Sequence, residues 1–308
     1  MIVVVCPGQG SQTPGFMLPW LDLPAFRSSI EAMQSAAGID LIAHGTVSDA
    51  DTIRDTSVAQ PLIVSAGVAT LAALFGETGK VSSKITGVAG HSVGEVTAAV
   101  ASGIFTAEQG IKFVKERGDA MALAAGLEPT SMAAILGGEQ AVVEARLAEL
   151  GLEPANYNGG GQIVAAGAAA AIGELQAAGP AGARVIPLQV AGAFHTRYMA
   201  PAVSTLASYS AGLTVNDPTA KLWSNAGGRL VDSGAEFVEL IVNQVKSPVR
   251  WDLCMSAMVE AGVTALIEVA PAGTLTGLAK RSMPGVETLA IKTPENLDAA
   301  LELIANHA

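Results

Sequence analysis

The sequence predicts an α/β fold in which a mostly parallel sheet carries a second, smaller subdomain inserted into it. Short apolar runs alternate with longer segments of helical character along most of the chain, which is the pattern of parallel strands joined by helices. One internal stretch, residues 127–190, shows a different order of strands and helices. Half of the 308 residues are hydrophobic, so the chain can bury a large core.

The first 126 residues supply the opening part of the main sheet. A buried strand is predicted over Ile2–Cys6, and the turn Pro7-Gly8-Gln9-Gly10 ends it. A second buried strand is predicted over Ile85–Ala89, and a helix follows it over Gly94–Ser102. Two longer helices are predicted over Gln60–Leu74 and Ala107–Ala124.

Residues 127–190 form the predicted insert. Strands are expected over Met132–Leu136, Asn156–Asn158, Gln162–Ala166 and Arg184–Leu188, and helices over Glu139–Leu150 and Ala168–Ala178. This βαββαβ order is that of a ferredoxin-like subdomain. The main domain is therefore predicted to be discontinuous, with residues 1–126 and 191–308 on either side of the insert.

Alternation of helix and strand resumes after the insert. Helices are predicted over Met199–Ala211, Glu236–Gln244, Trp251–Gly262 and Gly273–Lys280, and strands over Lys221–Ser224 and Ala265–Val269.

Composition excludes several classes of protein. The net charge of −11 argues against nucleic-acid binding, which needs a basic surface, and against attraction to anionic membranes. Cys6 and Cys254 are the two cysteines, and their scarcity fits a reducing compartment. We expect no signal peptide, and no uncharged apolar run of the roughly 18 residues that span a bilayer. The predicted location is cytoplasmic.

The segment Gly90-His91-Ser92-Val93-Gly94 is a G-x-S-x-G motif between a predicted strand and a predicted helix. A nucleophile elbow requires this setting, because the sharp turn exposes the serine hydroxyl at the start of a helix. The alternative is a glycine-rich turn in which the serine only caps the helix. The setting favours Ser92 as a nucleophile.

A serine nucleophile needs a base, and elimination among four histidines favours His195. His307 is beside the C-terminus, His44 lies in no motif, and His91 should point away from the Ser92 hydroxyl. Glu116 or Asp119 could complete a triad, but neither lies in a motif. A Ser-His dyad with a backbone carbonyl or amide behind the imidazole is as plausible.

An oxyanion hole needs two N–H donors. The backbone N–H of Val93, directly after the nucleophile, should be one, and the Gly8-Gln9-Gly10 loop could supply the other. The loop could instead be a plain turn. It is not a dinucleotide fingerprint, since Thr13 stands where the third glycine is needed.

The chain resembles the malonyl-CoA:acyl carrier protein transacylases, especially actinobacterial ones. The resemblance rests on segments in family order along almost the whole chain: Pro7-Gly8-Gln9-Gly10-Ser11-Gln12, Val58-Ala59-Gln60-Pro61, Gly90-His91-Ser92-Val93-Gly94-Glu95, Arg117-Gly118, Asn156-Tyr157-Asn158, Gly192-Ala193-Phe194-His195, Pro248-Val249-Arg250-Trp251 and Thr274-Leu275-Thr276-Gly277-Leu278. It implies an α/β-hydrolase-like core, malonyl-CoA and acyl carrier protein as partners, and a role in fatty acid or polyketide synthesis.

The resemblance also assigns roles to residues. Ser92 would be acylated, His195 would act as base and then acid, and the N–H groups of Gln9 and Val93 would form the oxyanion hole. Gln244 matches the position whose backbone carbonyl orients the histidine. Arg117 would bind the malonyl carboxylate, which a planar guanidinium holds bidentately, although it could instead be a surface arginine paired with a helix neighbour. Phe194 would narrow the pocket at the α-carbon, and in the wider acyltransferase family Phe before the histidine goes with malonyl and Ser with methylmalonyl.

Two other functions compete with acyl transfer. A serine esterase or thioesterase would use the same elbow, base and oxyanion hole, and a non-enzymatic α/β binding module would need none of them. No metal-ligand cluster or nucleotide loop is visible, so we expect no cofactor, with coenzyme A entering as part of the substrate. We expect a monomer. The acidic carrier protein should dock on a local basic patch drawn from Lys115, Arg197, Lys246, Arg250, Lys280 and Arg281.

Overall fold

The computed structural model describes residues 1–76, 78–190 and 192–307. Its main sheet has the strand order β10-β9-β1-β2-β7, and every neighbouring pair is parallel. The strands are β1 (Ile2–Cys6), β2 (Gly87–Gly90), β7 (Lys221–Trp223), β9 (Ala265–Glu268) and β10 (Glu287–Ala290). Every residue of the central strand β1 is buried, because helices cover both faces of the sheet. The predicted α/β fold with a mostly parallel sheet is confirmed.

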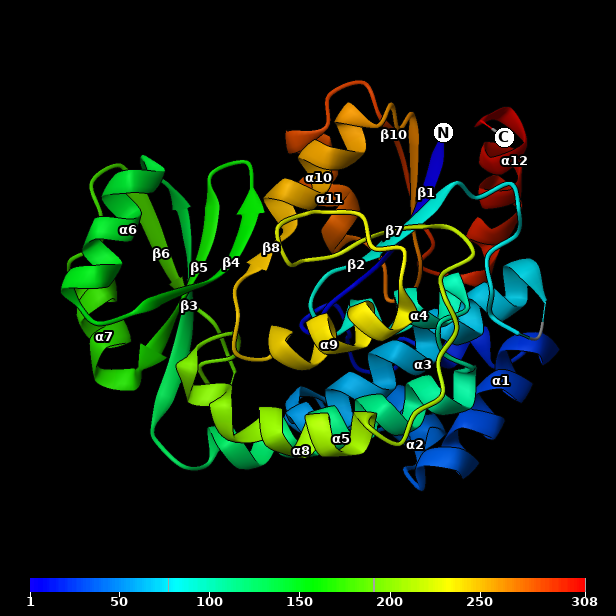
Figure 1. Cartoon of the computed structure of the whole chain (residues 1–308), viewed down its shortest axis with the longest axis horizontal. Coiled ribbons are helices and arrows are strands. Elements are labelled where there is room, and N and C mark those ends of the chain that lie inside the picture. The colour runs from blue at the N-terminus through cyan, green and yellow to red at the C-terminus, as the bar shows by residue number, and fades with distance from the viewer. Residues whose placement is uncertain (77, 191, 308) are drawn as a thin grey trace.

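The side chains of β1 alternate between two cores, as the pleat of a strand requires. Ile2, Val4 and Cys6 pack into the larger core and Val3 and Val5 into the smaller one. The helices that pack into the larger core include α1 (Pro24–Ala37), α3 (Thr56–Phe75), α4 (Gly94–Ser102), α5 (Ala107–Ala125) and α12 (Leu297–His307), and the later helices α8 (Ala200–Ser210) and α9 (Gly234–Gln244) also contribute to it. Those of the smaller core are α10 (Trp251–Glu260) and α11 (Thr274–Ser282). Figure 1 shows the two groups on opposite sides of the strands.

The expectation that no uncharged apolar run reaches the length of a bilayer span is wrong. Helix α3 has 20 residues without a charged side chain, and its most apolar window has a mean hydropathy of 1.8. However, 78% of that window is buried inside the protein. The helix is apolar on all sides because it is packed between α1, α4 and α5.

The second sheet has the order β6-β3-β5-β4-β8. It contains β3 (Thr130–Gly137), β4 (Glu153–Gly159), β5 (Gln162–Ala168), β6 (Ala183–Pro187) and β8 (Val249–Arg250). Its first four strands are antiparallel, and α6 (Gln140–Glu149) and α7 (Ala169–Ala177) pack on them over a small separate core. This is the expected ferredoxin-like arrangement, drawn in green in Figure 1. One strand was not expected, since β8 comes from the main domain and pairs in parallel with β4.

Other elements were also absent from the sequence interpretation. They are α1, α2 (Leu41–Thr46), β10 and α12. The later helices α8 (Ala200–Ser210) and α9 (Gly234–Gln244) lie where they were predicted, and α4 has the predicted limits. Residues 191 and 308, the two ends of the predicted second main-domain segment, lie outside the described residues. The division at 126/127 and 190/191 stays a prediction.

Candidate active site

The G-x-S-x-G segment forms a sharp turn between β2 and α4. Ser92 adopts a left-handed backbone conformation with φ of 53°, which is unusual for a residue with a side chain. The flanking glycines are required by close packing, because a Cβ on Gly90 would lie 2.0 Å from the backbone of Gly94. A Cβ on Gly94 would lie 2.1 Å from the carbonyl oxygen of Cys6 on the neighbouring strand. The turn therefore has the geometry of a nucleophile elbow.

Ser92 and His195 lie together although 103 residues separate them. The distance between Ser92 Oγ and His195 Nε2 is 2.6 Å. His195 Nδ1 lies 2.9 Å from the backbone carbonyl oxygen of Gln244, so Nδ1 is the donor and Nε2 is free to accept a proton. No carboxylate is hydrogen-bonded to this imidazole in the described part of the chain, and Asp119 instead pairs with Lys115. The arrangement is that of a dyad oriented by a carbonyl.

The imidazole is kept neutral by its surroundings. Burial, and then repulsion from the Arg117 charge, lower the pKa of His195 to about 3, and the bond to the Gln244 carbonyl only partly offsets them. A neutral imidazole is the form that can take a proton from serine. His91 has a different partner, because its Nε2 lies 2.8 Å from Asn158 Oδ1.

The third polar group of the site is Arg117, on α5. It is 1% exposed, which rules out the surface arginine considered above. Its Nη1 lies 2.6 Å from Gln60 Oε1 and its Nη2 lies 2.8 Å from Gln244 Oε1. Burial lowers the pKa of Arg117 to about 10, partly offset by the charge of Glu95, so the guanidinium remains a cation at neutral pH.

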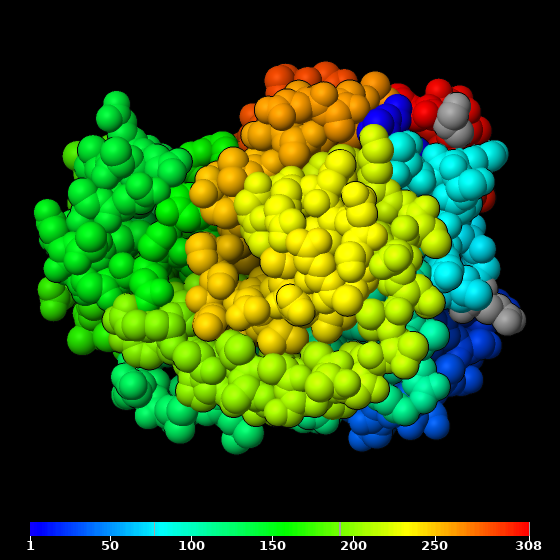
Figure 2. Space-filling model, in the orientation of Figure 1, coloured from blue at the N-terminus to red at the C-terminus, as the bar shows by residue number. Residues whose placement is uncertain are grey.

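A cavity of about 100 Å³ connects these groups. All of the predicted site residues except Gln244 line this cavity, together with residues of the insert. The residues that line it are Gln9, Gln60, His91, Ser92, Val93, Arg117, Met121, Met132, Asn156, Leu188, Val190, Phe194 and His195. Met132 and Asn156 come from β3 and β4, so the cavity lies where the two sheets meet. Figure 2 shows that the surface dips between the insert, drawn in green, and the neighbouring main-domain segment around β8 and α10, drawn in orange. Larger hollows of about 610 and 620 Å³ lie elsewhere and contain neither Ser92 nor His195.

Comparison with known proteins shows the family to which the chain belongs. A model of the acyl transferase domain family matches residues 3–293. The malonyl CoA-acyl carrier protein transacylase of Mycobacterium tuberculosis is 46% identical over 303 residues, which cover 98% of this chain and 100% of that protein. The chain is a member of the malonyl-CoA:acyl carrier protein transacylases.

A more distant relative and two solved structures match over the same length. The Escherichia coli K12 protein of that name is 33% identical, covering 97% of this chain and 98% of the relative. The crystal structure of the Mycobacterium tuberculosis enzyme superposes with a TM-score of 0.91 and covers 97% of this chain and 99% of that one. A malonyl-transacylase solved in complex with its type II PKS acyl-carrier protein has a TM-score of 0.91 at 29% identity, covering 98% and 99% of the two chains.

Asn225 is a site residue that sequence reasoning missed. It follows β7, which lies beside β2 in the sheet, and it is 1% exposed. Its Oδ1 accepts the backbone N–H of Ser92 at 2.8 Å, and its Nδ2 donates to the carbonyl of Gly90 at 2.7 Å. One side chain therefore braces both sides of the strained turn. The available signal was a polar residue two positions after a parallel strand, since such positions meet at one edge of the sheet.

Glu95 is a second residue of the site whose role the sequence did not indicate. It is buried in the first turn of α4, where it accepts the backbone N–H of Asn225 at 2.7 Å and the side-chain amide of Gln244. Burial raises its pKa to about 7, with these hydrogen bonds and Arg117 acting in the opposite direction. Glu95 is thus a buried acid directly behind the nucleophile.

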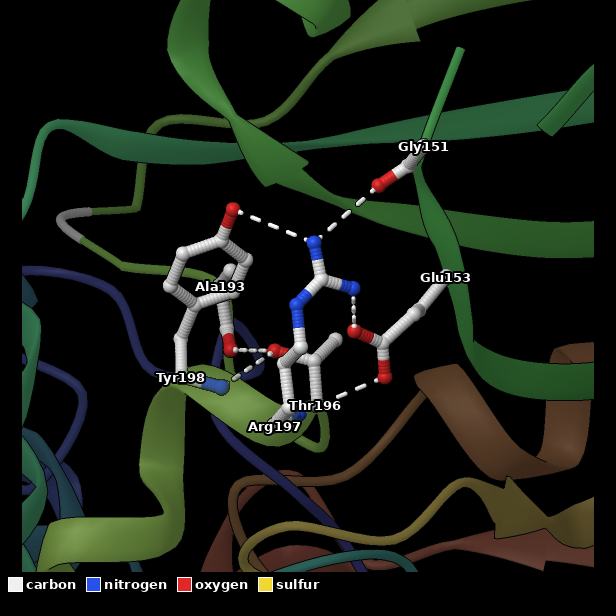
Figure 3. Close-up of polar contacts among 6 residues, drawn as sticks. All are labelled: Gly151, Glu153, Ala193, Thr196, Arg197 and Tyr198. Atoms are coloured by element: carbon white, nitrogen blue, oxygen red, sulfur yellow. Dashed lines mark hydrogen bonds and ion pairs between the residues drawn. The ribbon is translucent and has the colours of Figure 1, made fainter. Parts of the chain in front are cut away.

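The loop that carries His195 is fastened to the insert by Arg197 (Figure 3). The guanidinium forms an ion pair with Glu153 and donates to the carbonyl of Gly151 at 3.4 Å. Within the loop, Thr196 Oγ1 donates to the carbonyl of Ala193 at 2.7 Å. His195 itself has a φ of 63°, and its N–H donates to the carbonyl of Val245 at 2.9 Å. These contacts hold the strained residue between the insert and α9.

Proposed function

We propose that this chain transfers the malonyl group of malonyl-CoA to the phosphopantetheine thiol of acyl carrier protein through a malonyl ester on Ser92. The observation that carries the proposal is the 2.6 Å contact between Ser92 Oγ and His195 Nε2 in a cavity that also contains a buried cation, Arg117. The product would supply extender units for fatty acid (or polyketide) synthesis.

The first half-reaction acylates Ser92. His195 Nε2 takes the hydroxyl proton as Ser92 Oγ attacks the thioester carbonyl, and the resulting oxyanion is stabilised by the backbone N–H groups of Gln9 and Val93. Both residues line the cavity beside Ser92. When the tetrahedral intermediate collapses, the carbon–sulfur bond breaks and the imidazolium returns its proton to the leaving thiolate of coenzyme A.

The second half-reaction reverses these steps with a different thiol. The phosphopantetheine thiol gives its proton to His195 and attacks the malonyl ester, and Ser92 leaves as its hydroxyl after it recovers that proton. Every proton passes through one imidazole, which its Gln244 contact keeps in the tautomer that can accept at Nε2. This is a ping-pong scheme with no cofactor.

Two residues set the acyl selectivity in this proposal. Arg117 pairs with the free carboxylate of the malonyl group, because a buried guanidinium gains most from a bidentate anionic partner. Phe194, which is 6% exposed and borders the cavity next to the base, limits the space at the α-carbon.

The remaining features of the proposal concern the setting of the enzyme. We propose a cytoplasmic monomer, with residues 127–190 as an inserted subdomain on a discontinuous core. Both Cys6 and Cys254 are free and buried, as suits a reducing compartment. Among the described residues, no group of three or more His, Cys, Asp or Glu side chains could hold a metal ion.

Intact-mass measurement tests the proposal in two steps. Mixing the protein with malonyl-CoA should add one malonyl group, and this adduct should persist until the carrier protein is added. The carrier protein should then remove the adduct and gain the same mass. An adduct that is lost to water before the carrier protein is added would indicate a thioesterase instead.

A further inference from the structure

The buried charge of Arg117 is surrounded by neutral acceptors. Gln60 Oε1 and Gln244 Oε1 accept from its two terminal nitrogens at 2.6 Å and 2.8 Å. Gln60 is 1% exposed and Gln244 is 5% exposed, so neither contact is shared with bulk water. In the part of the chain that the structure describes, Arg117 forms no ion pair.

An acid is present nearby, but an amide separates it from the guanidinium. Gln244 accepts from Arg117 with its oxygen and donates to the Glu95 carboxylate with its nitrogen. Glu95 therefore acts on Arg117 only across the length of that amide. The pKa of Arg117 reflects this, since burial lowers it more than Glu95 raises it.

In this arrangement the positive charge of Arg117 is not balanced by a neighbouring carboxylate. Amide oxygens satisfy the geometry of the N–H groups but leave the net charge in place, and a buried charge without an ionic partner is unfavourable. A carboxylate in the position of either glutamine would neutralise the guanidinium and would compete with an anionic ligand. The cavity that Arg117 shares with Ser92 is therefore a place where a carboxylate of the substrate is strongly favoured.

We infer that Gln60, together with Gln244, is a specificity-determining positioning residue that holds Arg117 in place without neutralising it, so that its charge is kept for the carboxylate of the acyl group. The inference rests on the proposed role of Arg117. Gln60 lies on α3 and Gln244 at the end of α9, so two separate elements fix the plane of the guanidinium.

The Gln60→Glu variant tests the inference directly, because it changes charge with little change in shape. Among the described residues, the one hydrogen bond that Gln60 Nε2 donates is to the Met121 sulfur at 3.4 Å, so the new carboxylate gives up a single weak contact. We measure acylation of Ser92 by malonyl-CoA and by acetyl-CoA, and binding of both thioesters to the same variants in a Ser92→Ala background. Gln60→Met removes the acceptor without adding charge, and Gln109→Glu makes the same charge change at a half-buried position in the first turn of α5, which does not line the cavity.

The expected result is a graded loss of selectivity. Gln60→Glu should lower the malonyl-to-acetyl ratio at least tenfold through weaker malonyl-CoA binding, while acetylation changes less than about threefold. Gln60→Met should lower the ratio less, and Gln109→Glu should leave it unchanged.

Three outcomes would overturn the inference, and a fourth bears on the proposed function. The inference is contradicted if Gln60→Glu loses activity equally on both thioesters, or if it leaves the malonyl-to-acetyl ratio unchanged. It is also contradicted if Gln60→Met lowers that ratio as much as Gln60→Glu does. If Gln60→Glu leaves the ratio unchanged while Arg117→Ala alters it, only the inference fails. If Arg117→Ala itself leaves the ratio unchanged, the proposed role of Arg117 fails and the inference fails with it.

Discussion

Single side chains of this protein acquire their chemistry from partners that are distant in sequence. Ser92 and His195 were predicted together because one lies in an elbow motif and the other remained after elimination. In the structure, Ser92 Oγ lies 2.6 Å from His195 Nε2, and the backbone carbonyl of Gln244 accepts a hydrogen bond from Nδ1 on the other side of the imidazole. Neither Glu95 nor Asn225 could be assigned in this way, because their roles depend on β7 lying beside β2 and on the end of α9 reaching the elbow.

Removal of the nucleophile or the base should give distinct results. Ser92→Ala should abolish the malonyl adduct completely. His195→Ala should keep the hydroxyl but slow acylation by roughly three to six powers of ten, because serine alone is a poor nucleophile. Quenched-flow intact-mass measurement gives both rates. A normal malonyl adduct on the Ser92→Ala protein would refute the assignment.

Arg117→Ala should change which acyl group is accepted. The variant loses a charge-assisted contact to malonyl worth roughly 1.5–3 kcal/mol, and with acetyl it is relieved of a buried, unpaired charge. Both effects lower the malonyl-to-acetyl ratio of kcat/KM, and a tenfold change needs only about 1.4 kcal/mol. Equal slowing of both thioesters would make Arg117 a structural residue.

Glu95 should make stability depend on pH. Its pKa of about 7 in the folded protein lies above its ordinary value of 4.5, so the folded protein binds more protons than the unfolded chain between these values. Its contribution to stability is therefore full below pH 4.5 and is lost as the pH rises through 7. Relative to Glu95→Gln, the wild type should lose about 1–3 kcal/mol of unfolding free energy between pH 5 and pH 8.

Urea unfolding of both proteins at the two pH values measures this difference. His91 and His195, whose pKa values are lowered mainly by burial, shift stability the other way, but they do so in both proteins and cancel. A difference that stays constant with pH would show that Glu95 does not titrate in this range.

At the scale of elements, burial decided which parts of the fold could be predicted. The strand β1 and the helix α4 were predicted with the limits they have, since every residue in them is buried and apolar patterning is strong. The edge strand β10 was missed because its four residues are exposed or half-buried and carry little pattern. Helix α12 could have been found, because Ala300, Leu303 and Ile304 are buried at helical spacing.

The elbow between β2 and α4 should depend on the Asn225 brace. Asn225→Ala leaves the Ser92 N–H and the Gly90 carbonyl without their partner, at about 1–3 kcal/mol for each buried group. We expect lower stability and at least a tenfold slower acylation by malonyl-CoA and acetyl-CoA alike, because Ser92 loses its fixed orientation. Thr70→Ala is a matched control, since it removes a buried hydroxyl that donates to the Ala66 carbonyl in α3.

The control separates a loss of stability from a loss of orientation. Thr70→Ala should be destabilised but should acylate at the wild-type rate at a temperature where both variants are folded. If Asn225→Ala acylates equally fast under those conditions, the brace contributes to folding alone.

The whole molecule places its chemistry at the junction of two sheets. The elbow belongs to the parallel sheet, while Met132 and Asn156 of the insert border the same cavity. The sequence could indicate both sheets, because each has its own periodicity. It could not indicate that β8 joins the second sheet, because a two-residue strand has no periodicity and its pairing is set by how the two parts pack.

The structure narrows the basic patch that was predicted to receive the carrier protein. Three of the six candidates already have acidic partners, since Lys115 pairs with Asp119, Arg197 with Glu153 and Arg250 with Asp252. Of the six candidates, the exposed cations without an ion pair among the described residues are Lys246, Lys280 and Arg281. We therefore expect these three to contribute most to docking.

Transfer to the carrier protein should be sensitive to salt and to these charges. This protein has a net charge of −11 and we expect an acidic carrier protein, so docking should need local attraction, which is screened over about 8 Å at physiological ionic strength. Lys280→Glu with Arg281→Glu, on the last turn of α11, should slow transfer from the malonyl enzyme to the carrier protein at least tenfold at low salt and less at high salt. Transfer to free pantetheine should be unchanged, and Lys84→Glu, an exposed change on the loop before β2, should have little effect. A carrier rate that is independent of both salt and the double charge reversal would place the docking surface elsewhere.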